Sequence, residues 1–269
     1  MNKKILEVKN LTKKFGDVTA VNTISFSIDR GEIFGVVGPN GAGKTTTIKI
    51  LTTLLPPTSG EALIGGYNVV KNATKVRRII GYVPQMLSAD GNLTGYENLL
   101  IFAKLYDIPS KERKKRIIDS LHFMGLTDVA DKMVKSFSGG MIRRLEIAQA
   151  VLHNPKVLIL DEPTVGLDPG ARDSVWEYVK TLAGKGTTVL MTTHYMEEAD
   201  AMCSRVAIMN RGNIAALGSP HDLKISIGDD GASLNKVFEY YIGKNLDSGV
   251  SEGNFKDVSR TRRTTKRLG

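Results

Sequence analysis

The sequence lacks the features that hold together a disulfide-rich or membrane-spanning protein. Its 269 residues include a single cysteine, Cys203, which excludes an internal disulfide framework and is typical of a reducing compartment. No apolar run approaches the roughly 18–20 residues that a bilayer crossing requires. The first residues are polar and lead into an alternating segment, which does not resemble a signal peptide. We therefore expect a soluble, cytoplasmic protein in which Cys203 is a structural thiol.

Positive charge is concentrated at the C-terminal end. The formal net charge is +9, and residues 254–269 hold six basic residues and one acidic residue, a net charge of +5. A solubilising tail and a contact with anionic lipid or nucleic acid both fit such a segment. Without it only a mild positive excess remains, which argues against nucleic-acid binding as the main activity.

Hydrophobic periodicity alternates between strand and helix along the chain. Strands are predicted at residues 5–8, 24–28, 33–37, 61–64, 79–83, 157–160, 188–193 and 206–209. Helices are predicted at residues 43–55, 94–106, 111–124, 138–153 and 168–183. Residues 13–17 read as a turn, and the stretch after residue 219 shows little pattern. This order predicts an α/β sheet that carries an inserted helical subdomain.

A glycine-rich loop lies between the apolar run 33–37 and the helix predicted from residue 43. The pattern is G-x-x-x-x-G-K-[ST], in the strand–loop–helix setting that this motif requires. Backbone N–H groups and the positive end of the helix can wrap a phosphate there. Lys44 adds a charge to the β and γ oxygens, and Thr45 offers a hydroxyl to Mg²⁺. The matching residues are Gly38, Pro39, Asn40, Gly41, Ala42, Gly43, Lys44 and Thr45.

Two carboxylates follow the second apolar run, residues 157–160. Ligands of parallel sheets bind at the carboxyl ends of the strands, where Asp161 and Glu162 stand. Asp161 is placed to hold Mg²⁺, and Glu162 is placed to take a proton from an attacking water. Beside a phosphate-binding loop, these acids indicate nucleotide hydrolysis.

Residues 137–141 read Phe-Ser-Gly-Gly-Met and precede the two carboxylates by about twenty residues. They resemble the signature motif of ABC transporter ATP-binding subunits, usually LSGGQ, with Phe137 and Met141 as departures. Small residues here begin a helix whose free N–H groups can face a γ-phosphate, which in this family belongs to the other subunit of a dimer. Met141 lacks the hydrogen bonds of a glutamine amide, so nucleotide affinity or dimer contacts can differ modestly. The resemblance covers about residues 5–223.

The resemblance assigns further residues. Gln85 resembles the glutamine that contacts the metal and the attacking water and couples to the membrane subunit, and His194 resembles the switch histidine at the γ-phosphate. Phe15 matches the aromatic position that stacks on adenine. The implied catalytic set is Glu162, His194, Gln85 and Lys44, and the implied metal set is Thr45, Gln85 and Asp161. The remaining implied ATP contacts are Thr46, Ser138, Gly139, Gly140 and Asp168.

The resemblance also implies an architecture and partners. The expected fold is a P-loop NTPase cassette of the ABC type, with a mixed parallel core sheet and an N-terminal antiparallel β subdomain. The cassette would occupy residues 1–223, with helices inserted at about 88–155, and residues 224–269 would form a partly disordered extension. We expect ATP and Mg²⁺ as ligands, an ATP-dependent homodimer, an integral membrane permease of the ABC-2 type, and a peripheral place on the inner face of the cell membrane.

The motifs also point to a branch of the family. Met141, the following arginines and residues 193–200 resemble the drug-resistance exporters, daunorubicin-resistance-like. An importer subunit and a soluble ABC ATPase without a transporter remain alternatives. Translation ATPases resemble tandem cassettes and DNA-repair ATPases carry long coiled coils, whereas this chain has one cassette and no heptad run. A non-enzymatic binder built on a degenerate cassette would not need Lys44 and Glu162 intact.

Overall fold

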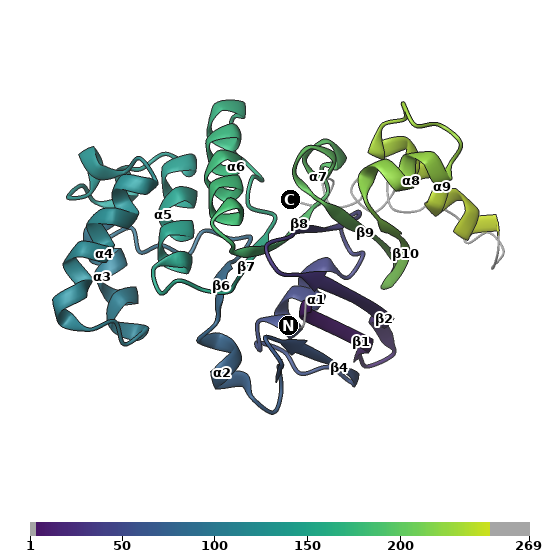
Figure 1. The fold of residues 1–269 in the computed structure, drawn as a ribbon, viewed down its shortest axis with the longest axis horizontal. Coiled ribbons are helices and arrows are strands. Elements are labelled where there is room, and N and C mark those ends of the chain that lie inside the picture. The colour runs from purple at the N-terminus through teal and green to yellow at the C-terminus, as the bar shows by residue number, and fades with distance from the viewer. Residues whose placement is uncertain (1–3, 248–269) are drawn as a thin grey trace, which may run out of the picture.

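The computed structural model describes residues 4–247, in which two sheets and the surrounding helices share one chain (Figure 1). The basic segment 254–269 lies outside the described residues, so its predicted role stays a prediction. Within residues 4–247, none of the helices has both the length and the apolar composition needed to cross a bilayer.

The predicted N-terminal antiparallel subdomain is confirmed. Within the described residues it consists of four strands in the order β2-β1-β4-β5, namely β1 (Lys4–Phe15), β2 (Val18–Asp29), β4 (Ser59–Ile64) and β5 (Tyr67–Asn68). The turn predicted at residues 13–17 is too wide, because Phe15 already pairs with Val18. Irregularities in the β1–β2 register interrupt the period-two alternation, which is why the sequence indicated much shorter strands.

The main sheet is mixed, as predicted. In the described part of the chain its order is β10-β9-β3-β8-β7-β6, and only the β9–β10 pair is antiparallel. Because β8 inserts between β3 and β7, segments far apart in the sequence become neighbours. The strands are β3 (Ile33–Val37), β6 (Ile80–Val83), β7 (Val157–Asp161), β8 (Thr188–Thr193), β9 (Arg205–Asn210) and β10 (Asn213–Gly218).

The continuous apolar runs are buried on both faces of the main sheet. Ile33 and Val37 of β3 belong to the core that contains the inserted helices, whereas Phe34 and Val36 belong to the core shared with the antiparallel sheet. Helix α1 (Lys44–Leu51) packs into the second core. A strand covered on both sides has no solvent face to mark with polar residues, which explains the unbroken apolar sequence.

The inserted helical part contains α3 (Gly95–Leu105), α4 (Ser110–Phe123) and α5 (Gly139–Val151), which lie together at one end of the molecule (Figure 1). Two short 3-10 helices, Thr127–Val129 and Val134–Ser136, connect α4 to α5. The capping box predicted at the start of α3 is present. Thr94 Oγ1 accepts from the Glu97 backbone N–H at 3.1 Å, and the Glu97 carboxylate accepts from the Thr94 N–H at 2.8 Å.

The remaining helices are α2 (Ala73–Arg77), α6 (Pro169–Gly184), α7 (Met196–Met202), α8 (Pro220–Ser226) and α9 (Leu234–Asp247). The sequence showed little pattern after residue 219, yet α8 and α9 lie there. Leu223, Leu234 and Val237 are buried against the larger core. The cassette boundary at residue 223 remains a prediction, and α8 spans it.

Cys203 follows α7 directly and is 7% exposed. Burial raises the pKa of its thiol, so the reactive thiolate is scarce at neutral pH. We expect an aromatic disulfide reagent to label almost no thiol in the native chain and one thiol per chain in denaturant. The absorbance of the released thiol measures this, and complete labelling of the native chain within seconds would contradict the structural assignment.

Candidate functional site

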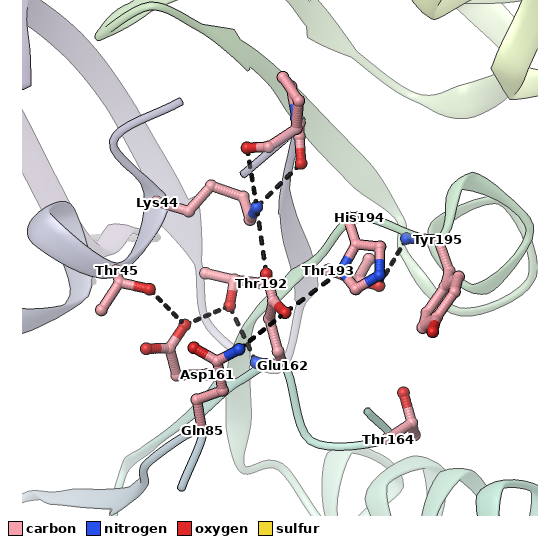
Figure 2. A network of polar contacts seen from close by, with 12 residues as sticks. Lys44, Thr45, Gln85, Asp161, Glu162, Thr164, Thr192, Thr193, His194 and Tyr195 are labelled. Atoms are coloured by element: carbon pink, nitrogen blue, oxygen red, sulfur yellow. Dashed lines mark hydrogen bonds and ion pairs between the residues drawn. The ribbon is translucent and has the colours of Figure 1, made fainter. Parts of the chain in front are cut away.

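The sequence motifs converge on one edge of the main sheet. Strands β3, β8, β7 and β6 are consecutive neighbours and run parallel, so their carboxyl ends lie side by side. Val37 pairs with Thr193 and Asp161 pairs with Thr192, which brings the glycine loop, the carboxylates and His194 to the same level. Gln85 follows β6 at the same edge. This topology places four separate motifs around one spot (Figure 2).

The last residue of the glycine loop has no room for a side chain. Gly43 is the residue before α1 and has φ of 103°, and a Cβ on it would lie 2.4 Å from the Ala20 carbonyl oxygen. Lys44 is the first residue of α1, and its ammonium donates to the Gly38 carbonyl at 2.8 Å and to the Pro39 carbonyl at 3.2 Å. The loop therefore curls around a buried cation.

Glu162 is the point at which the predicted catalytic residues meet. Its carboxylate lies 3.1 Å from the Lys44 ammonium, accepts from the Gln85 amide at 3.2 Å, and lies 3.2 Å from His194 Nδ1. Figure 2 shows the three side chains pointing toward this carboxylate. Glu162 is 4% exposed and has a positive φ of 49°, a region that non-glycine residues occupy at some energetic cost. Such backbone conformations cluster at active sites.

Asp161 occupies a second polar position beside Glu162. Its carboxylate accepts from Thr192 Oγ1 at 2.6 Å and from Thr45 Oγ1 at 3.3 Å. Desolvation by burial raises the pKa of Asp161, while the hydrogen bonds from Thr192 and Thr45 oppose that shift. The hydroxyl of Thr192 also accepts from the Glu162 backbone N–H at 3.0 Å. Thr192 thus holds the Asp161 carboxylate and the Glu162 backbone, a role that the sequence analysis missed although a threonine pair ending an apolar strand was visible.

The oxygen atoms of Thr45 and Asp161 are suited to Mg²⁺. Hard oxygen donors are the ligands it prefers, and it commonly takes one or two carboxylates together with substrate phosphates. Among residues 4–247, no three His, Cys, Asp or Glu side chains form a ready metal cluster. Gln85, the third predicted metal ligand, instead directs its amide to Glu162. The donor set fits a metal that arrives with phosphate better than a permanently bound one.

The signature motif lies at the start of α5, apart from the Lys44 cluster, and only part of it is exposed. Ser138 caps the helix by accepting from the Met141 N–H at 3.3 Å, and both Ser138 and Gly139 face solvent. Gly140 is buried, and a Cβ on it would lie 2.6 Å from the Cβ of Ala171 on α6. Met141, the departure from the usual glutamine, packs against the core.

A buried ion pair ties α5 to the segment that carries Gln85. Arg143 and Glu146, one turn apart on α5, are 2.9 Å from each other. The Arg143 guanidinium donates to the Pro84 and Gln85 carbonyls at 2.7 and 2.8 Å, and Glu146 accepts from the Ser88 backbone N–H. The signature helix and the Gln85 segment are therefore fixed to each other. The sequence analysis used only the arginines that follow Met141, and only for the family resemblance.

The other predicted ATP contacts lie at the surface. Phe15, at the end of β1, is 49% exposed, and the Lys13 ammonium lies 5.1 Å from its ring centroid. Asp168 is exposed and caps α6 by accepting from the Ala171 N–H at 2.9 Å. Pro39, Asn40 and Gly41 are exposed in the glycine loop, whereas Thr46 is half-buried at the start of α1.

Comparison with known proteins assigns this arrangement to a family. The family model described as ABC transporter matches residues 21–165. Linearmycin resistance ATP-binding protein LnrL of Bacillus subtilis (strain 168) is 44% identical over 226 residues, 84% of this chain and 73% of that protein. Daunorubicin resistance ATP-binding protein DrrA3 of Streptomyces coeruleorubidus is 41% identical over 225 residues, 84% of this chain and 71% of that protein.

The fold agrees with that of a solved ABC transporter subunit. A solved structure of the ATP binding subunit of an ABC transporter matches with a TM-score of 0.81 at 32% identity, covering 88% of this chain and 99% of that one. Two relatives are drug-resistance ATP-binding proteins, which confirms the predicted branch. Because a family model matches more than half of the residues and the relatives exceed 40% identity, the chain belongs to the ABC transporter family, as a subunit that binds ATP and hydrolyses it to drive transport.

Proposed function

We propose that this chain hydrolyses Mg-ATP at the Glu162 site and, as a dimer, powers export through a separate membrane permease. The observation that carries the proposal is the convergence of Lys44, Gln85 and His194 on the Glu162 carboxylate. Phosphoryl transfer to water depends on positioning and charge neutralisation more than on covalent chemistry. A buried carboxylate with three polar partners beside a phosphate loop supplies both.

Each residue around the site has a role in this mechanism. The backbone N–H groups of the glycine loop and the Lys44 ammonium bind the β and γ phosphates. Glu162 accepts the proton of the attacking water, while Gln85 and His194 orient that water and the terminal phosphate. Thr45 and Asp161 would hold Mg²⁺, which neutralises charge on the phosphate oxygens when it is bound.

A second copy of the chain would complete the site. The exposed start of α5, at Ser138 and Gly139, offers unpaired backbone N–H groups that suit the γ-phosphate bound on a facing copy. Asp168, also exposed at a helix start, lies on the segment that follows Glu162 and would border the same interface. ATP shared between two surfaces holds them together, and loss of the γ-phosphate releases them.

The membrane partner is assigned by analogy with the relatives. These relatives are named for resistance to linearmycin and daunorubicin. By analogy, the proposal gives this chain a drug-like substrate, a permease of the ABC-2 type and a peripheral position on the inner membrane face. Met86 and Leu87, directly after Gln85, are 82% and 50% exposed. Exposed apolar side chains beside the site suit a contact that transmits its closure to the permease.

The proposal is tested by phosphate release from ATP with the purified chain. We expect release to require Mg²⁺, to stop in EDTA, and to rise with about the square of protein concentration while dimers are scarce. A rate strictly proportional to concentration over a wide range would contradict the shared site. Isolation of the chain from membranes should recover an integral membrane protein with it, and recovery without one would contradict the transporter assignment.

A further inference from the structure

A buried carboxylate outside the proposed mechanism lies behind the switch histidine. Glu198, on α7, is 6% exposed. It accepts from Thr193 Oγ1 at 2.9 Å and from Thr164 Oγ1 at 2.6 Å, and both threonines are 1% exposed. An ionised carboxylate is costly to bury unless its oxygens are satisfied, so a site with two hydroxyl donors is a specific arrangement.

The charge of Glu198 is balanced by Arg172 from the first turns of α6, whose Nε lies 3.5 Å from Glu198 Oε1. The same guanidinium lies 5.2 Å from the ring centroid of Tyr195, within the range of a cation–π contact. The Tyr195 ring in turn lies 4.1 Å from the His194 ring at an interplanar angle of 38°. Glu198 and Arg172 together therefore contact both sides of the histidine segment.

The backbone around His194 is held by the same group. Thr193 Oγ1 donates to Glu198 and accepts from the Tyr195 backbone N–H at 2.9 Å. The residue before His194 and the residue after it are thus joined through one hydroxyl that Glu198 orients. Figure 2 shows Tyr195 beside His194, whose imidazole points to Glu162.

We infer that Glu198 is a positioning residue for ATP hydrolysis, which acts by fixing His194 against Glu162. The inference rests on the proposed role of His194. Through Thr164 the same carboxylate also holds the segment that leads from Glu162 to Asp168. The segment before the switch histidine and the segment that borders the proposed dimer interface therefore share one buried anchor. Both oxygens of Glu198 are engaged by the Thr164 and Thr193 hydroxyls, so the carboxylate acts through these neighbours.

The first test replaces Glu198 by Gln. The amide keeps the size of the side chain but has a single acceptor oxygen, so one of the two threonine hydroxyls loses its partner and Arg172 loses its counter-charge. Since small misplacements of catalytic groups are expensive, we expect kcat to fall about 10- to 100-fold with KM changed by less than about twofold. Phosphate release from Mg-ATP over a range of ATP concentrations gives both constants.

A matched pair of threonines separates positioning from stability. Thr193 and Thr188 are both buried on β8, and each accepts a hydrogen bond from a backbone N–H at 2.9 Å, from Tyr195 and Gly31 respectively. Thr193→Val should lower kcat as Glu198→Gln does. Thr188→Val, at the opposite end of the strand, should lower the melting temperature but leave kcat within about twofold. Equal losses of kcat in the two valine variants, or none in Thr193→Val, would overturn the inference.

The decisive comparison uses the His194→Ala background, followed with radiolabelled ATP so that slow turnover is measurable. A residue that acts through the imidazole has no effect once the imidazole is gone, so adding Glu198→Gln should change kcat by less than about twofold. A further loss of about tenfold or more would show that Glu198 does not act through His194. If the His194→Ala variant hydrolyses ATP at the unsubstituted rate, the proposed catalytic role of His194 is wrong. That result is distinct from a failure of the inferred link between Glu198 and His194.

Discussion

Glu162→Gln should bind Mg-ATP with nearly unchanged affinity and hydrolyse it about 10²–10⁴-fold more slowly, the usual contribution of a general base. The amide preserves the size of the side chain but cannot accept a proton from water. Because the γ-phosphate then persists, the chain should accumulate as an ATP-bound dimer. Phosphate release gives the rate, nucleotide titration gives the affinity, and size-exclusion chromatography with light scattering gives the dimer.

A second buried glutamate serves as the control for this substitution. Glu32 is 9% exposed and pairs with Arg205 at 2.7 Å, but it precedes β3, at the opposite end of the strand from the glycine loop. Glu32→Gln should cost stability and leave kcat within about twofold. Near-normal hydrolysis by Glu162→Gln would reject Glu162 as the base, and a comparable loss in Glu32→Gln would show that the assay reports folding.

Ser138→Arg is expected to abolish dimer closure while the single chain still binds nucleotide. Ser138 is exposed at the start of α5, away from the Lys44 cluster, so a long cationic side chain there meets only a facing copy. Hydrolysis should fall by about 10²-fold or more, because the groups that contact the γ-phosphate from the partner are kept at a distance. Light scattering with Mg-ATP and nucleotide titration at low protein concentration separate the two effects.

The substitution also removes a helix cap, which costs about 1 kcal/mol. Ser219 is the matched control, since it caps α8 by accepting from the Asp222 N–H at 3.0 Å. Helix α8 lies far from α5, on the other side of the main sheet (Figure 1). Ser219→Arg should lower stability to a similar degree without loss of dimer or turnover. Loss of nucleotide binding by single Ser138→Arg chains, or dimerisation as in the unsubstituted chain, would show that the signature has been misplaced.

Local sequence predicted those parts of the fold in which local patterns decide the structure. The runs at β3 and β7 are apolar throughout because cores cover both faces, and the glycine loop and the start of α5 carry their own turn and cap residues. The long strands β1 and β2 were underestimated because their irregular register interrupts the alternation. Helix α9 was missed because, among its residues 234–243, only Leu234 and Val237 are buried, so its position depends on tertiary packing.

Each motif of the site could be found in the sequence, but the sequence did not show that the motifs meet around Glu162. Glu162 contacts Lys44, Gln85 and His194 because of the order of the strands in the sheet. Strand β8 comes late in the sequence but lies between β3 and β7. No local pattern specifies that order. The anchors behind the site, Arg143 and Glu198, were likewise hidden, because a charged residue in a helix is usually solvated and only packing reveals that it is buried.

The strand register, in which Val37 pairs with Thr193 and Asp161 pairs with Thr192, fixes the relative positions of the catalytic residues. Neighbouring residues along a strand are about 3.3 Å apart, so a slip of one residue in β8 would displace His194 by a whole hydrogen-bond length and reverse the face of every side chain. Hydrogen bonds between the strands, more than the loops, thus determine where the reacting groups at the strand ends lie relative to one another. Side chains in the loops can therefore change while the reacting groups stay aligned.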